Sequence, residues 1–450
     1  MNVTNVLAEF ISGLRYDQIP PEAIQTAKRA ILDCLGVALA GSREEDAKIC
    51  AEIARQEGAV EESVVLGSGF KSSAMQAGFA NGTAAHALDF DHSFTLMGQP
   101  TAPIIPAAFA LADSLGATGR QLVESYVAGF EVAGKLVHTL RETPHDGWHG
   151  PGSMGAFGAS AACSKLLGLT AAQMQMALGI TASMASAIVA NFGTMTKPLH
   201  VGMAARNGIL AAKLAQSGFT ANRQAIEGNF GFYKVLHPNA VVDETPLSEL
   251  GRSFALVSDP IRVKPYPCGG LTHQAIDSVL ALRAEHKITA EAVESIDVDV
   301  TKHTFDRIVF RIPQNGIQGK FSMNYLLARA IIDGRIGLHI FTDETVRNPD
   351  VVKLAERVEM HLDPNLKGRD PGGRPCRVTI RLRSGEVYSR EAQHAKGSPG
   401  VPISQAELES KFMECAREVL SESTAQRALE YIGRIERLED VRLLSNLLLG

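Results

Sequence analysis

The sequence predicts a mainly α-helical protein, with a large all-α domain built from the N-terminal part and the C-terminal helices, and an inserted α+β domain. The chain has 450 residues, 45% hydrophobic and 21% charged, which is long for one hydrophobic core. A helical period runs from residue 20 to about residue 260, and alternating patterns typical of strands follow it. We therefore expect residues 1–264 and 396–450 to form the helical domain and residues 265–395 the α+β domain.

The first long helix shows the pattern of the N-terminal part. Pro21 is tolerated in a first turn, Glu22 favours the positive end of the helix dipole, and Gly41 can end the helix. Many inward positions of the later helices are Ala or Gly, which let helices approach closely, so we expect tight packing. These further helices fit residues 103–117, 120–139, 155–167, 170–190, 200–217 and 223–228.

The pattern changes after "KPYPCGG". One more helix fits residues 271–285, and "VESIDVDVT" and "RVEMHLD" then alternate apolar and polar residues as half-buried strands do. "CRVTIRLRSGEVYSREA" reads as a hairpin that turns at Ser384–Gly385. Beyond it, Ser404 and Glu407 have the spacing of a capping box, which predicts that helices run to the C-terminus.

Composition excludes several classes of protein. A net charge of −5 gives no broad basic field for nucleic acid or an anionic membrane. The six cysteines contain no C-x-x-C pair, which argues against a zinc or iron–sulfur site. The N-terminus has no basic segment before its apolar residues, and no apolar run approaches the roughly 20 residues of a membrane span. We expect a cytoplasmic protein that binds neither nucleic acid nor a membrane.

The stretch "HALDFDHSF" has three interpretations. His86, Asp89, Asp91 and His92 could hold a divalent metal, carry out proton chemistry without one, or simply close a helix. If the stretch is helical, Asp89 and Asp91 lie about 200° apart and cannot share one ion. In the last interpretation, Asp91 or Ser93 caps a helix and the other polar groups are hydrogen-bonded.

Two further stretches of the helical part contain candidate site residues. "GPGSMG" fits G-x-G-x-x-G formally, but it lacks the preceding strand and the later acidic residue of a dinucleotide site. His149 stands before this loop at a helix start, where it could act as general acid or base or serve as a structural hydrogen-bonding group. Lys197 precedes Pro198 just before a helix that also contains Arg206. A cation near the positive end of a helix dipole is unfavourable unless the cation and the helix end share a bound anion.

A third stretch, "VKPYPCGGLTHQ", lies at the expected domain junction, where pockets tend to form. It contains Lys264, Cys268 and His273. The Cys–His pair raises the possibility of a thiol nucleophile, but neither an oxyanion-hole turn nor an orienting third residue is evident. We therefore interpret these residues as candidate substrate contacts.

Taken in order, several stretches resemble the MmgE/PrpD family from about residue 5 to residue 445. They are "NGTAAHALDFDHS", "GSMGAFGASAACSKLLGL", "GTMTKPLHVGMAARNGILAA", "KPYPCGGLTHQAID" and "GKFSMNYLLARAIIDG". The resemblance implies a large helical domain, an α+β lid domain, a homodimer, and a site between the domains that needs no metal and no other cofactor. Known members include 2-methylcitrate dehydratase, cis-aconitate decarboxylase and iminodisuccinate epimerase, so it also implies a small di- or tricarboxylate substrate.

The resemblance also assigns site residues. The positions that match the family's motifs are Asp89 as the first aspartate of D-F-D-D-T, Ser93 in place of its threonine, His149, the two lysines Lys197 and Lys264, and Tyr325. Many dehydratase and decarboxylase members have His-Pro some ten residues after that aspartate, whereas this chain has Gln99 before its proline. A glutamine can hold a carboxylate by hydrogen bonds but cannot exchange a proton near neutral pH.

These residues predict carbanion chemistry beside a carboxylate. We expect His149 and Asp89 to transfer the proton, and Lys197 and Lys264 to bind carboxylates and stabilise the developing charge. The residues expected to contact or orient the substrate are Ser93, Gln99, Ser153, Arg206, Cys268, His273 and Tyr325. A lyase that dehydrates or decarboxylates is the first interpretation. Gln99 favours an epimerase that removes and returns an α-proton, and a catalytically silent carboxylate-binding or scaffold relative is the third.

Overall fold

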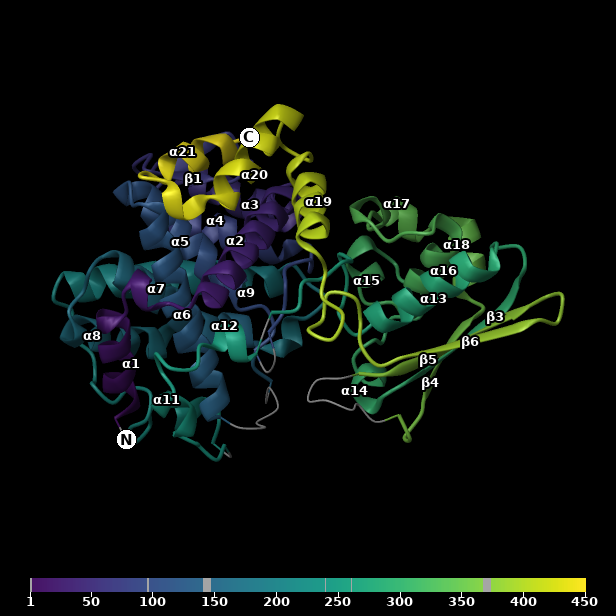
Figure 1. Cartoon of the computed structure of the whole chain (residues 1–450), viewed down its shortest axis with the longest axis horizontal. Coiled ribbons are helices and arrows are strands. Elements are labelled where there is room, and N and C mark those ends of the chain that lie inside the picture. The colour runs from purple at the N-terminus through teal and green to yellow at the C-terminus, as the bar shows by residue number, and fades with distance from the viewer. Residues whose placement is uncertain (1, 95–96, 141–146, 239, 260, 367–373) are drawn as a thin grey trace. The chain divides into compact units, whose positions relative to one another are not determined.

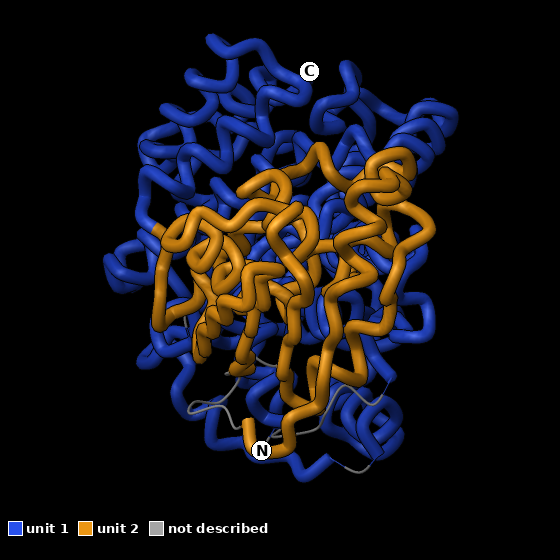
Figure 2. Tube along the Cα trace, turned by 90° about the vertical axis from the view of Figure 1, so that its right-hand side faces the viewer, with its two compact units in different colours: residues 1–261, 404–450 blue, residues 262–403 orange. Residues whose placement is uncertain are grey.

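The computed structural model describes residues 2–94, 97–140, 147–238, 240–259, 261–366 and 374–450. The chain divides into two compact units, coloured separately in Figure 2. Unit 1 comprises residues 1–261 and 404–450, and unit 2 comprises residues 262–403. Unit 2 is thus formed by one continuous segment between the two segments of unit 1.

Unit 1 is built mainly from helices, which confirms the mainly α prediction (Figure 1). The C-terminal helices contact α2 of the N-terminal segment, so the two ends of the chain share one unit. The helices are α1 (Val3–Gly13), α2 (Pro21–Gly41), α3 (Glu45–Gln56), α4 (Ala74–Ala87), α5 (Thr101–Leu115), α6 (Gly119–Thr139), α7 (Gly150–Leu166), α8 (Ala171–Met184), α9 (Thr196–Gln216), α10 (Phe232–Leu236), α11 (Thr245–Ser248), α12 (Ala255–Ser258), α19 (Gln405–Ala416), α20 (Glu422–Gly433) and α21 (Arg442–Ser445).

Small residues let the central helices of unit 1 cross at close range. A Cβ atom added to Gly82 of α4 would lie 3.0 Å from the Cα atom of Gly202 in α9. One added to Gly208 of α9 would lie 2.5 Å from the Cβ atom of Ala159 in α7. Any larger side chain would push these helices apart. The expected tight packing is therefore confirmed, and it fixes α4, α7 and α9 against one another.

Unit 2 is an α+β layer structure. Its sheet has the order β4-β3-β5-β6, from β3 (Val293–Val300), β4 (Val358–Leu362), β5 (Cys376–Leu382) and β6 (Val387–Ala392). β4 is parallel to β3, and the other neighbouring pairs are antiparallel. The helices are α13 (His273–His286), α14 (Lys302–Phe305), α15 (Gly316–Gly319), α16 (Met323–Asp333), α17 (Asp343–Val346) and α18 (Pro349–Ala355).

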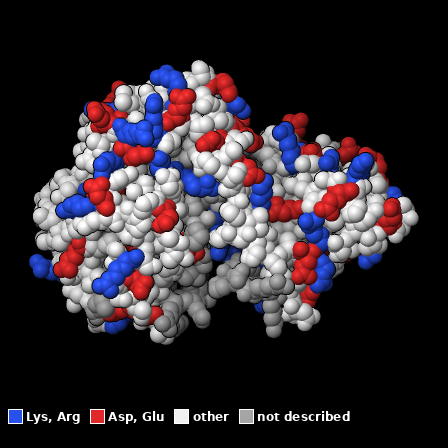
Figure 3. Space-filling model, in the orientation of Figure 1, with Lys and Arg blue, Asp and Glu red and all other residues white. Residues whose placement is uncertain are grey.

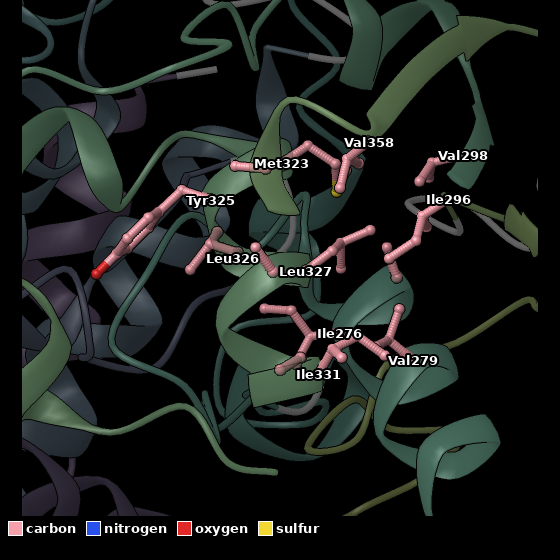
Figure 4. Packing of buried hydrophobic residues seen from close by; sticks show 14 of the residues in the cluster. Ile276, Val279, Ile296, Val298, Met323, Tyr325, Leu326, Leu327, Ile331 and Val358 are labelled. Atoms are coloured by element: carbon pink, nitrogen blue, oxygen red, sulfur yellow. The ribbon is translucent and has the colours of Figure 1, made fainter. Parts of the chain in front are cut away.

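One face of this sheet is covered by α13 and α16. Figure 4 shows Ile276 and Val279 of α13 and Leu327 of α16 packed toward Ile296 and Val298 of β3. The alternate residues of β3 that face the core are fully buried. The predicted alternation is thus confirmed. Burial of these side chains stabilises the unit, by about 25 cal/mol per Å² of apolar surface removed from water.

Several predicted elements are confirmed at residue level and others are wrong. The hairpin turns between β5 and β6, and Ser404 and Glu407 form the capping box of α19. Residues 223–228 form turns instead of a helix. The Asn222 side chain accepts from the backbone N–H of Gln224, a local hydrogen bond that competes with helical pairing. Neither Asp91 nor Ser93 caps a helix, since the next helix, α5, begins only at Thr101.

Two more details differ from the sequence prediction. The helix expected over 170–190 ends at Met184, and Ile188 pairs instead with Trp148 in an isolated β-bridge. A small hairpin, β1 (Ser63–Val65) with β2 (Phe70–Ser72), lies within the helical unit. Its strands are three residues long, which is too short for a periodic signal.

The surface has no large field of one charge on the face shown in Figure 3, where acidic and basic side chains are interspersed. Within the described part of the chain, no helix is both long and apolar enough to cross a membrane.

Candidate active site

A buried lysine joins two helices of unit 1. His86 lies in the last turn of α4, and Lys197 lies in the first turn of α9. The Lys197 Nζ atom lies 3.0 Å from His86 Nε2 and 2.8 Å from Asp89 Oδ1. All three side chains are buried. The close crossing of α4 and α9 thus brings a cation, an imidazole and a carboxylate together.

A left-handed residue turns the chain after α4. The helix ends at Ala87, and Asp89 has a φ of +51°, a conformation that aspartate tolerates better than most residues. Asp89 therefore faces Lys197, while Asp91 folds back on His86, with its Oδ2 atom 2.9 Å from His86 Nδ1. The two carboxylates lie on either side of the same lysine–histidine pair.

The hydrogen-bond partners assign the protons. An ammonium group only donates, so His86 Nε2 accepts from Lys197. His86 Nδ1 then carries the hydrogen and donates it to Asp91. Burial lowers the pKa of His86, and the charge of Lys197 lowers it too, against the opposing effect of Asp91. The imidazole is therefore neutral near neutral pH, in an ordered chain from Asp91 through His86 to Lys197.

Two more histidines extend the cluster. His149 is the N-cap residue of α7, and its Nδ1 atom lies 3.2 Å from Nδ1 of His200. The rings of His86 and His149 are 5.4 Å apart between centroids. Burial, together with the charge of Lys197, holds the pKa of His149 well below its usual range, and burial lowers the pKa of His200 to about 4. Both imidazoles are thus neutral at neutral pH.

The low pKa of His200 predicts an acid-sensitive stability. Its pKa is about 4 in the folded chain and 6.5 ordinarily, so between those values the unfolded chain binds more protons and stability falls as the pH falls. A His200→Asn variant is expected to lose less stability than the wild type between pH 6.5 and pH 4, measured by urea unfolding at several pH values. A variant of the partly exposed His361 serves as control, and an equal loss in His200→Asn and wild type would contradict the prediction.

The other predicted site residues of unit 1 lie in α7, in α9 and in the segment between α4 and α5. Ser153 is buried in the first turn of α7, where its hydroxyl donates to the carbonyl of His149 at 3.2 Å. Ser93 and Gln99 are half-buried and flank the bridge between Phe94 and Gly98, which brings them to neighbouring positions. Arg206 follows Lys197 by nine residues and therefore lies about 180° around α9, away from the cluster.

Unit 2 contains the remaining predicted residues. Lys264, Cys268 and His273 lie in and just after the segment that leads into α13, and all three are buried. His273 Nε2 lies 3.3 Å from the Cys268 carbonyl, and the Cys268 thiol lies 3.6 Å from the Thr272 hydroxyl. The thiol is completely buried, which disfavours a thiolate nucleophile.

Tyr325 is the last predicted site residue of unit 2. Its hydroxyl donates to the backbone carbonyl of Ile340, and burial raises the pKa of its phenol. Figure 4 shows the ring at the edge of the core cluster, with its hydroxyl pointing away from Ile296 and Val298. The described contacts of Tyr325 are thus those of a packing residue, and a role in substrate binding stays a prediction.

Among the residues that the structure describes, two groups of side chains have the composition of a metal site. The ligand atoms of His86, Asp89 and Asp91 lie within 4.8 Å of one another. The expectation that the two aspartates cannot meet around one ion is wrong, because the chain leaves the helix before Asp89. An ion there would compete with the Lys197 ammonium for His86 and Asp89. The second group, Asp297, Glu359 and His361, lies on the sheet of unit 2 and is more exposed.

Three members of the cluster are not among the site residues predicted from the sequence. His86 and Asp91 lie in the stretch "HALDFDHSF", where one interpretation makes them structural, and His200 follows Lys197 by three residues. The spacing of three residues between Lys197 and His200 could have found it, since such residues share one helix face.

Comparison with known proteins covers nearly the whole chain. The family profile of the MmgE/PrpD N-terminal domain matches residues 5–245, and that of the MmgE/PrpD C-terminal domain matches residues 266–437. The chain is 30% identical to cis-aconitate decarboxylase of Homo sapiens, over 100% of this chain and 95% of that protein. It is 29% identical to the Mus musculus enzyme of that name, over 100% and 94%, and 25% identical to that of Aspergillus terreus, over 99% and 96%. The chain therefore belongs to the MmgE/PrpD family.

Proposed function

We propose that this protein is a lyase that decarboxylates cis-aconitate or a closely similar tricarboxylate. Similarity to cis-aconitate decarboxylases over their full length supports the substrate class. The observation that carries the proposal is the buried Lys197 ammonium, held between Asp89 and His86 among neutral imidazoles. A desolvated cation of this kind favours a substrate whose negative charge shifts during reaction.

The proposed reaction needs an acid. The bond between carbon and one carboxylate breaks as CO2 leaves, and its electron pair forms a new double bond. The electron pair of the original double bond moves to the carbon beside a remaining carboxylate, and this carbon takes up one proton. Of the groups in the cluster, the three imidazoles have lowered pKa values, whereas Lys197 has protons to give.

We therefore assign the proton donation to Lys197. Asp89 and His86 orient the Lys197 ammonium, and Asp91 fixes the tautomer of His86. This assignment moves the proton from His149 and Asp89, the pair expected from the sequence, to the lysine. His149, being neutral, is proposed to bind the substrate by a hydrogen bond.

The finer features implied by the family resemblance are part of the same proposal. We propose that Lys264 binds a substrate carboxylate, that unit 2 serves as a lid, and that the protein is a cytoplasmic homodimer. Light scattering of the purified protein tests the dimer. The substrate contact is tested by the KM of a Lys264→Met variant. An unchanged KM would contradict the proposal that Lys264 binds a substrate carboxylate.

Gln99 favours an epimerase as the second candidate. Its amide is half-buried beside Ser93 and cannot exchange a proton near neutral pH. Many dehydratase and decarboxylase members have a histidine at this position. A site without that histidine could remove and return an α-proton through the remaining groups, without loss of CO2.

Incubation with cis-aconitate in D2O separates the candidates. The lyase is expected to release CO2 and give a product with one deuterium on carbon, equally with and without EDTA. Exchange of an α-hydrogen without net product would indicate an epimerase. Absence of both across a panel of di- and tricarboxylates would overturn the enzymatic assignment in favour of a binding protein.

A further inference from the structure

The segment from Asp89 to His92 is tied on two sides. Asp89 and Asp91 face the Lys197–His86 pair. The other two residues of the segment, Phe90 and His92, are held by different groups. The Phe90 carbonyl accepts from Lys411 Nζ at 2.8 Å, and the His92 backbone N–H donates to Asp33 Oδ2 at 3.0 Å. Four consecutive residues are thus fixed alternately by the site and by the scaffold behind it.

The groups behind the segment form an ion pair between distant parts of the chain. Lys411 Nζ in α19 lies 2.6 Å from Asp33 Oδ1 in α2, and both side chains are buried. The ammonium also lies 3.8 Å from the centroid of the Phe90 ring. Burial opposes the ionisation of Asp33, but the charge of Lys411 and the hydrogen bond from His92 outweigh it and lower the pKa to about 2. Asp33 is therefore a carboxylate throughout the working pH range.

A second set of hydrogen bonds orders the His92 ring. Its Nδ1 atom lies 2.9 Å from Asp33 Oδ2, and its Nε2 atom lies 2.6 Å from the Thr101 hydroxyl. The Thr101 hydroxyl lies 2.7 Å from that of Tyr126. With Nδ1 donating to the carboxylate, Nε2 accepts from Thr101, which accepts from Tyr126. Each group in this series of hydrogen bonds from Asp33 to Tyr126 thus has a partner.

We propose that Lys411 and Asp33 are positioning residues for the active site, acting through the backbone of Phe90 and His92. A residue with a side chain persists in the left-handed conformation of Asp89 only where its surroundings fix it. The clamp formed by Lys411 and Asp33 supplies this constraint and aims Asp89 at Lys197. The inference rests on the proposed function only for its kinetic readout.

The test is a Lys411→Met variant, which keeps the apolar stem and removes the donors. We expect kcat for cis-aconitate to fall about 30-fold with little change in KM, as for other groups that orient catalytic residues. Backbone amides of residues 89–92 should exchange with D2O faster than in the wild type. Lys411→Arg, which can still donate to both acceptors, should restore part of kcat.

A matched control separates positioning from stability. Lys135 in α6 is also buried, donates to the Ser253 carbonyl at 2.7 Å and lies 3.5 Å from Glu131. Lys135→Met removes another buried lysine and its contacts elsewhere in unit 1. It is expected to lower stability but to leave kcat and the exchange of residues 89–92 as they are.

Two outcomes would overturn the proposal. The first is a Lys411→Met variant with wild-type kcat and wild-type amide exchange. The second is an equal fall of kcat in Lys411→Met and Lys135→Met. If Lys411→Met does not fold, Asp33→Asn is measured in the same way and should change both quantities in the same direction. If the wild type does not decarboxylate cis-aconitate, the proposed function fails, and amide exchange alone decides on the clamp.

Discussion

A Lys197→Met variant is expected to have a kcat about 1,000-fold below that of the wild type, the largest loss among single substitutions in the cluster. The substitution removes both the proposed proton donor and the positive charge nearest Asp89, and such acids contribute roughly 100- to 10,000-fold. It also leaves the buried Asp89 carboxylate without its lysine, which should destabilise the fold by about 3 kcal/mol. Steady-state kinetics and urea unfolding measure the two effects.

A double variant separates the two effects. Lys197→Met with Asp89→Asn removes the uncompensated charge, so stability should recover while kcat stays low. Lys213→Met is the control on the same helix, since that lysine is more exposed and lies 3.7 Å from Glu62. A kcat for Lys197→Met within about tenfold of the wild type would exclude Lys197 as the proton donor.

The second large effect is expected from Asp91→Asn, with a fall in kcat of about 100-fold. The wild-type carboxylate accepts from His86 Nδ1–H and so leaves Nε2 free of hydrogen to accept from Lys197. An asparagine amide can donate to Nδ1 and favour the other tautomer, in which Nε2–H would face the ammonium donors. Lys197 would then lose its orientation although the side-chain shape is preserved.

The control for this variant is another buried aspartate of unit 1. Asp113 accepts from the Val64 backbone at 2.8 Å and from the Ser445 hydroxyl, and it belongs to no part of the cluster. Asp113→Asn should lower thermal stability without changing kcat. A wild-type kcat in Asp91→Asn would show that the His86 tautomer has no part in the reaction.

The fold could be predicted well where periodicity is strong. The alternation in β3 and the capping box at Ser404 were readable because each is a local pattern. Residues 223–228 do not form the predicted helix, because the local hydrogen bond from the Gln224 backbone to the Asn222 side chain competes with it and leaves no mark on the periodicity. The β1–β2 hairpin could not be predicted, since its three-residue strands are too short to show a period.

The candidate site could be predicted only in part. Asp89, His149 and Lys197 were recognised from their motifs, and the structure brings them into one cluster. Its geometry depends on the left-handed φ of Asp89, which no residue pattern announces. The contact of Asp33 with Lys411 joins positions 378 residues apart, and one sequence contains no signal for such a pair.

The alternation along Asp89–His92 has a consequence for how this enzyme can be altered. Neighbouring residues of this segment are held from opposite sides. Inserting or deleting a single residue there would turn the following residues to the wrong side, and the contacts with both the Lys197–His86 pair and the Lys411–Asp33 pair would be lost. The length of this segment is therefore as constrained as its composition. Ser93 and Gln99, the proposed substrate contacts, lie outside the tied residues and are half-buried, so substitutions there should leave this framework intact.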